Sequence, residues 1–167
     1  MRFFLIAVFT VIFAVTSFTR NTDMNYDLLA DRRLADALEL ASDGASEQVQ
    51  IASVANGDIV FNQAAADSTF KTILANNLAL DPSTLTPLSN SMYQSGATVN
   101  VEQFFDYSNT TFPYTYDNPQ YGIDVVLTGP AIVYNVTLPV PKNFESSPSG
   151  FPLTWTKVAS YPGIYTN

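Results

Sequence analysis

Few residues in this chain could carry out acid–base, nucleophilic or metal chemistry. The sequence has no histidine and no cysteine, so the commonest general base, thiol nucleophiles and thiolate metal ligands are missing. The acidic residues remain, and those of the C-terminal half are Glu102, Asp106, Asp117, Asp124 and Glu145. Their spacing neither separates an acid from a base nor repeats the dense Asp and Asn pattern of a calcium loop. We therefore expect no enzyme activity, no metal site and no cofactor.

Aromatic side chains are the second group that could act, through contact rather than catalysis. Five of them lie between residues 106 and 121, namely Tyr107, Phe112, Tyr114, Tyr116 and Tyr121. Exposed tyrosines supply contact area at a low cost in side-chain entropy. These candidate surface residues could cover the open face of a sheet, contact a neighbouring subunit or stack on the sugar rings of a surface glycan. The sequence alone leaves the three alternatives open.

Charge and short motifs add two expectations about partners and modification. The formal net charge is -8, and beyond Arg33 the only basic residues are Lys71, Lys142 and Lys157. Because no basic patch can form to neutralise phosphates, nucleic acid is a poor candidate partner. Triplets that begin at Asn109 and Asn135 match the acceptor pattern for N-glycosylation.

An apolar run from Phe3 to Phe18 is the element around which the rest is organised. The 17 residues from Phe3 to Thr19 carry no charge, and as a helix they would extend about 25 Å, at the lower limit for crossing a bilayer core. Three interpretations compete. The run is a secretory signal cleaved before Phe18, a permanent anchor, or an anchor that later leaves the bilayer to form the core of a filament.

Helix-compatible sequence continues beyond the run, with no proline or glycine before Gly44. Small apolar residues recur there every three or four positions, at Ala30, Leu34, Ala37 or Leu38, Ala41, Ala45, Val49 and Ala52. We expect one helix over 1–52, hydrophobic first and amphipathic afterwards, with Gly44 as its weakest point. The apolar stripe either packs on its own domain or, because it is rich in alanine, allows close approach of a helix from another subunit.

The remainder, 53–167, predicts a small α+β head outside the membrane. A second helix is expected over 64–80, with Asp67 as its N-cap and Asp81–Pro82 ending it. Residues 82–97 resemble a connector.

A β-rich region follows the connector. Strands are expected at 123–128 and 131–140, joined as a hairpin at Gly129–Pro130, and again at 153–160. A loop punctuated by Pro139, Pro141, Pro148 and Pro152 is expected between the last two. The fold class is therefore α+β, with a long N-terminal helix, a second shorter helix and a C-terminal antiparallel β-sheet.

The basic N-terminus, the apolar run 3–18, its amphipathic extension and the small β-rich head together resemble the type IV pilin superfamily. The segment FKTILANNLAL at 70–80 is similar to the second segment of tight-adherence (Tad) type minor pilin-like proteins. The chain departs from the superfamily at Leu5, where these pilins typically carry a glutamate.

This resemblance implies a structural subunit of an extracellular cell-surface filament. The subunit would be membrane-inserted before assembly and would then form a helical homopolymer, with itself as partner. The alternative is a single-pass, membrane-anchored extracellular module that binds carbohydrate or cell wall through an aromatic loop expected at 106–121. The residues predicted to form the assembly helix are Phe3, Phe4, Leu5, Ile6, Val8, Phe9, Val11, Ile12, Phe13, Val15, Phe18, Leu34, Leu38 and Ala41.

Overall fold

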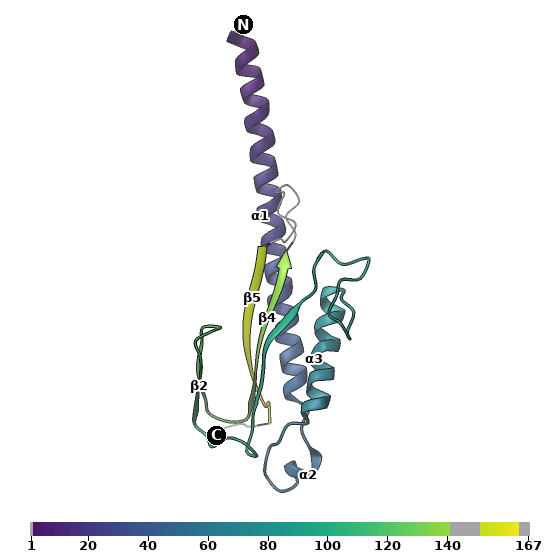
Figure 1. The fold of residues 1–167 in the computed structure, drawn as a ribbon, viewed down its shortest axis with the longest axis vertical. Helices are drawn as coiled ribbons and strands as arrows, with labels where there is room; N and C mark the ends of the chain where they lie inside the picture. The colour runs from purple at the N-terminus through teal and green to yellow at the C-terminus, as the bar shows by residue number, and fades with distance from the viewer. Residues whose placement is uncertain (1, 141–150, 164–167) are drawn as a thin grey trace.

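The computed structural model describes residues 2–140 and 151–163 and confirms the α+β class. Its helices are α1 (Arg2–Ser46), α2 (Ile51–Val54) and α3 (Gln63–Leu78), and its strands are β1 (Thr98–Phe105), β2 (Tyr114–Asn118), β3 (Ile123–Leu127), β4 (Ala131–Val140) and β5 (Phe151–Ser160). The N-terminal part of α1 projects from the molecule as a bare rod (Figure 1). Its C-terminal part packs beside α3, and both helices contact one face of the sheet.

Helix α1 ends at Ser46, six residues before the predicted end. Gly44 lies inside the helix and does not terminate it. The last carbonyls of the helix are capped locally, because the Ser46 hydroxyl donates to the Asp43 carbonyl and the Gln48 amide donates to the Gly44 carbonyl. The chain then turns back, and Val49 forms an isolated bridge with Phe61.

Small apolar residues of α1 pack inside the chain's own head. We call Ala30, Ala37, Ala41 and Ala45 the alanine stripe, and all four are buried. They share one core with Phe70 and Leu74 of α3 and with the inner face of the sheet. A Cβ atom added at Gly44 would lie 2.5 Å from Cδ1 of Ile73, which shows how closely α1 and α3 approach. The stripe therefore serves packing on its own domain.

This packing corrects part of the predicted assembly helix. Leu34, Leu38 and Ala41 have exposed fractions of 0%, 1% and 0% and contact the chain's own core, so they present no surface to another subunit. Because the core includes α1 from Ala30 onward, the head begins inside the helix and not at residue 53.

The N-cap predicted for α3 is wrong by five residues. Asn62 caps the helix by accepting from the Ala65 N–H at 3.2 Å. Asp67 lies within the helix and forms an i, i+4 ion pair with Lys71 at 2.8 Å. The helix ends at Leu78, where Ala79 adopts a left-handed conformation with φ of 53° and its N–H bonds to the Ala75 carbonyl.

The main sheet is antiparallel, in the order β1-β4-β5, and β2 pairs with β3 as a separate hairpin. Alternate side chains of the central strand β4 enter two different cores. Ile132, Tyr134 and Val136 face the helices, whereas Ala131 and Val133 face the hairpin. The sheet is therefore covered on one face by α1 and α3 and over part of the other by β2 and β3.

The predicted hairpin between 123–128 and 131–140 is wrong, because β3 pairs with β2 and β4 pairs with β1 and β5. Ile123 and Leu127 of β3 are buried against the outer face of the sheet. A strand that stacks on the sheet in this way cannot also extend it, so Gly129–Pro130 leads the chain from one layer to the next.

Two of the prolines predicted to lie in a loop are strand residues. Pro139 of β4 and Pro152 of β5 stand opposite each other in the ladder. The ladder between β1 and β4 begins at Thr98 and Thr137, so β4 has passed the end of β1 before it reaches Pro139. Pro141 and Pro148 lie outside the described residues.

Enlarging the alanine stripe is expected to destabilise the head. In Ala41→Leu the added atoms have no space between α1 and its neighbours, and overpacking of this kind costs roughly 1–3 kcal/mol. The matched control is Asp43→Leu, which places leucine on an exposed position of the same turn and should change stability by less than about 0.5 kcal/mol. Denaturant titration of the full chain in detergent, followed by circular dichroism, measures both. Equal effects would contradict the packing described.

Candidate functional site

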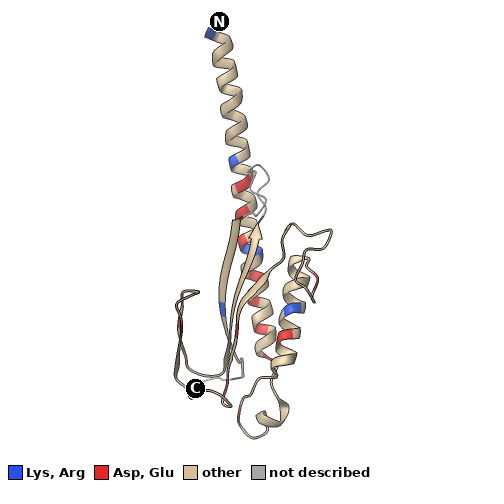
Figure 2. Cartoon of the chain, viewed as in Figure 1, with Lys and Arg blue, Asp and Glu red and all other residues tan. Residues whose placement is uncertain are grey.

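The N-terminal part of α1 is an apolar surface without a partner in the described chain. We call residues 3–18 the apolar segment, and every one of them is exposed. The exposed fractions of its large side chains run from 40% for Val8 to 89% for Phe3, and all eleven predicted assembly residues between Phe3 and Phe18 belong to it. Charged residues border it only at Arg2 and Arg20 (Figure 2).

The apolar segment suits surroundings that contain no water. The threonine hydroxyls of Thr10 and Thr16 donate to the carbonyls of Ile6 and Ile12, at 2.9 and 2.7 Å, so these polar groups are satisfied within the helix. By length and composition α1 could cross a membrane, with a mean hydropathy of 2.0 in its most apolar window. A signal sequence near an N-terminus meets the same criteria.

Hydrogen bonds from two sides hold the middle of α1, beyond the apolar segment, in the head. On the sheet side, the Trp155 indole N–H donates to Asp31 at 2.8 Å and the Lys157 ammonium contacts Glu39 at 2.9 Å. These contacts join β5 to the polar side of α1, the first where α1 enters the head and the second about two turns further on. Nothing in the sequence pattern pointed to Trp155, because its partner is 124 positions away.

The connector between α3 and β1 holds α1 from the other side. The Tyr26 hydroxyl donates to the Met92 carbonyl at 2.6 Å, and the Tyr93 hydroxyl donates to the Ala30 carbonyl at 3.3 Å. Burial raises the pKa of Tyr26, and it raises the pKa of Tyr93 to about 12, so both phenols remain donors at neutral pH. The direction in which the apolar segment leaves the head is therefore set by side chains as well as by the helix.

The five predicted contact aromatics divide into two groups. Phe112, Tyr116 and Tyr121 pack against the core beneath the hairpin, as expected for residues that cover the open face of a sheet. Tyr107 and Tyr114 have exposed fractions of 48% and 40%. Only these two of the five expose enough ring surface to meet a partner.

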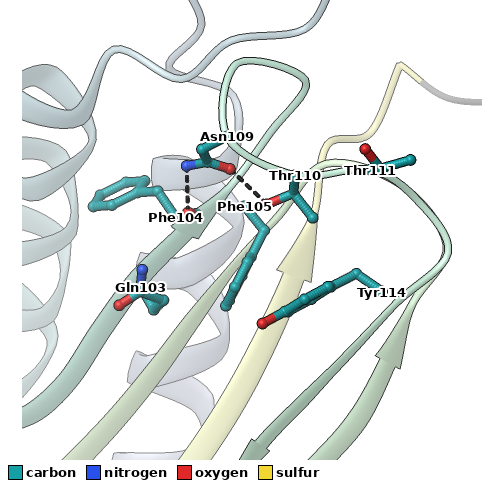
Figure 3. Close-up of a pocket in the computed structure, with 7 residues that line it drawn as sticks. All are labelled: Gln103, Phe104, Phe105, Asn109, Thr110, Thr111 and Tyr114. Atoms are coloured by element: carbon teal, nitrogen blue, oxygen red, sulfur yellow. Dashed lines mark hydrogen bonds between the residues drawn. The ribbon is translucent and has the colours of Figure 1, made fainter.

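Tyr114 borders a hollow of about 340 Å³ between β1 and the start of β2 (Figure 3). Gln103 and Phe105 of β1 form one side, and the loop Asn109–Thr111 forms another. Asn109 fixes this loop, because its amide N–H donates to the Phe104 carbonyl at 3.0 Å while its side-chain oxygen accepts from the Asp106 N–H and the Thr110 hydroxyl. The hollow therefore has a rigid rim.

The predicted glycosylation positions differ in accessibility. Asn135 has an exposed fraction of 1%, and its amide donates to Thr156 while accepting from Asn100, both at 2.7 Å. The folded chain therefore gives no access to this amide, which corrects the prediction for Asn135. Asn109 is exposed, although its amide nitrogen is already engaged as described above.

The acidic residues of the head lie in several separate parts of it. Asp106 is buried and holds the chain before α3 by accepting from the Phe61 N–H at 3.0 Å, a structural role that the sequence did not indicate. Asp117 and Asp124 stand opposite each other in the hairpin, and Glu145 lies outside the described residues. Over 2–140 and 151–163, no three His, Cys, Asp or Glu side chains are grouped to hold a metal ion.

Glu102 is the acid whose surroundings alter its chemistry most clearly. It is half-buried on the inner face of β1, where its side chain accepts from the Tyr134 hydroxyl at 3.3 Å. Burial raises the pKa of Glu102, the nearby Asp67 carboxylate raises it further, and the Lys71 ammonium partly offsets this. Tyr134 in turn stacks on Phe70 with ring centroids 3.7 Å apart, and burial raises its pKa as well.

Glu102→Gln is expected to raise stability at neutral pH. Because the pKa of Glu102 is higher in the folded chain than its usual 4.5, the folded state binds more protons and loses stability as pH rises past that value. Glutamine removes this loss while keeping an oxygen for Tyr134 and adding N–H donors towards Asp67. Thermal unfolding of both proteins between pH 3.5 and 7.5 should show curves that meet at the acid end and separate above it.

The control for this comparison is Glu47→Gln, which alters an exposed acid immediately after α1. It should follow the wild-type pH curve throughout. A Glu102→Gln protein that is less stable at pH 7, or that parallels wild type at every pH, would contradict the assigned origin of the shift.

Two surfaces of different character therefore result from the geometry. The apolar segment is long and uncharged, and its two threonine hydroxyls bond within the helix, whereas the hollow beside Tyr114 is small and lined by aromatic and neutral polar residues. The chain matches no protein-family model, no curated protein and no solved structure.

Proposed function

We propose that the chain is a non-enzymatic structural subunit of an extracellular cell-surface filament, similar to subunits of the type IV pilin superfamily, and that it assembles through the apolar segment of α1. One observation carries the proposal. A single helix of 45 residues, about 68 Å long at 1.5 Å per residue, is bare and apolar at one end and buried in a folded head at the other.

The energetics of the apolar segment favour association. Burying a Val, Leu, Ile or Phe side chain contributes roughly 1.5–3 kcal/mol, and eleven such side chains are exposed between Phe3 and Phe18. Association costs roughly 4–15 kcal/mol in lost freedom. Burial of about half of these side chains against neighbouring copies would therefore offset that cost without any disulfide.

The shape of the segment offers a way for copies to fit together. A shallow apolar hollow lies on one side of the helix where Ala7 provides little bulk, with Phe4, Val8 and Val11 around it. A large side chain from a second copy could occupy it, as in knobs-into-holes packing. Because such a contact joins two different surfaces, its repetition produces an open helical array wherever the rotation between successive copies does not close into a ring.

The proposed location follows from the same segment. Before assembly it would lie in the membrane, with Arg2 on the cytoplasmic side and the head outside. The excess of acidic over basic residues and the absence of cysteine suit an extracellular, solvent-facing head. In the filament the heads would form the outer coat.

An acidic residue in the apolar segment should abolish assembly without unfolding the head. In Phe9→Asp a carboxylate is placed where a bilayer or a filament core offers no water, at a cost of roughly 2.5–3.5 kcal/mol. The head should keep its melting temperature, because Phe9 contacts none of the core residues. Electron microscopy of native protein should show filaments for wild type and none for Phe9→Asp.

The matched control is Ile51→Asp, an equivalent change at an 87% exposed residue of α2, far from the apolar segment. It should assemble as wild type does. The proposal is wrong if native protein is seen only as monomers or closed oligomers with α1 in lipid, which is the outcome expected of an anchored binding module. Mass spectrometry of the mature N-terminus gives an independent answer, since cleavage before Phe18 would remove the assembly surface.

A further inference from the structure

The hollow beside Tyr114 combines an aromatic surface with several uncommitted polar groups. The Tyr114 ring points towards Phe105, with centroids 5.3 Å apart, and remains 40% exposed (Figure 3). Within residues 2–140 and 151–163, the side-chain polar atoms of Gln103, Thr111 and Tyr114 form no hydrogen bond. Thr110 uses its hydroxyl proton on Asn109 at 2.6 Å and keeps its lone pairs as acceptors.

The rim of this hollow is organised before any ligand arrives. Asn109 and Asp106 hold the loop through hydrogen bonds to main-chain and side-chain groups. Phe105 is buried beneath the hairpin and supports the Tyr114 ring. A ligand would therefore pay little to order its site, which is the usual condition for useful affinity from a small contact area.

The chemistry of the lining selects a class of ligand. None of the residues that border the hollow is charged, so neither a phosphate nor an ammonium group would find a counter-charge there. The chain's net charge of -8 also disfavours anions. A ring face beside amide and hydroxyl groups matches a sugar, whose C–H face is apolar and whose edge carries hydroxyls that both donate and accept.

We propose that this hollow, bordered by Gln103, Phe105, Thr110, Thr111 and Tyr114, is a binding site for a neutral carbohydrate. Tyr114 supplies the ring on which a sugar stacks, and Gln103 and the two threonines supply hydrogen bonds to its hydroxyls. The site is independent of the apolar segment and goes beyond the structural role proposed above. In a filament it would lie on the outer coat, and in a membrane-anchored monomer it would face outward.

The test uses the full chain dispersed in a detergent without a sugar headgroup. An array of neutral oligosaccharides containing glucose, galactose, mannose or N-acetylglucosamine is compared with sialylated and sulfated glycans. We expect binding to at least one neutral oligosaccharide, and isothermal titration then measures its affinity. Tyr114→Ala should weaken that affinity about tenfold through loss of the stacking surface.

Tyr107→Ala is the matched control, since Tyr107 is 48% exposed but does not border the hollow. It should bind as wild type does. Gln103→Ala should weaken binding about threefold to tenfold, and Tyr114→Phe should retain most of the stacking, so the proposal remains testable even if Tyr114→Ala folds poorly.

Three results would overturn the site. They are no binding to any neutral oligosaccharide, binding confined to the anionic glycans, and an equal loss of affinity in Tyr107→Ala and Tyr114→Ala. Because the protein is dispersed in detergent, none of these results depends on whether filaments form, and failure of assembly would leave them unchanged.

Discussion

Close packing of the alanine stripe of α1 against α3 and the sheet is the contact on which the rest of the molecule depends. Alanines at this interface let three elements share one core, and Gly44 allows Ile73 of α3 to lie almost against the α1 backbone. Close-packed protein interiors have low compressibility and resist small deformations. The helix is therefore held as a rigid part of the head, although its first half makes no contribution to the head's core.

Because α1 is one continuous helix, its exposed N-terminal part is held rigidly relative to the head. Neither glycine nor proline interrupts the chain between Arg2 and Asp43, and bonds from Trp155 and Tyr93 hold the point where α1 leaves the head. A sharp kink in a helix needs one of a few identifiable causes, and glycine and proline are the commonest. Whatever surrounds the apolar segment, a bilayer or other subunits, therefore also determines how the head and its Tyr114 surface are oriented.

The sequence predicted the parts of the fold that depend on local pattern, and it failed where distant segments compete. The long helix and the second helix follow from spacing and from the absence of breakers. Strand pairing was missed because β3 and β4 are neighbours in sequence but lie in different layers, and only the burial of Ile123 and Leu127 against the sheet decides this. The alanine stripe has the same pattern whether its partner is α3 or another subunit. Similarly, the hollow beside Tyr114 combines residues of β1, a loop and β2 that no spacing connects.

The facing prolines of β4 and β5 limit the addition of a foreign strand at this end of the sheet. Proline has no backbone N–H group. Two prolines can therefore face each other in an antiparallel ladder only at a non-hydrogen-bonded pair, where both backbone nitrogens point away from the partner strand. The nitrogen of Pro139 points to the side of β4 where the ladder with β1 has ended. The nitrogen of Pro152 points outward from the edge strand β5. Neither border can therefore donate a full set of hydrogen bonds to a foreign strand. In the assembly proposed above, this would favour order set by the helices over aggregation through accidental extension of the sheet.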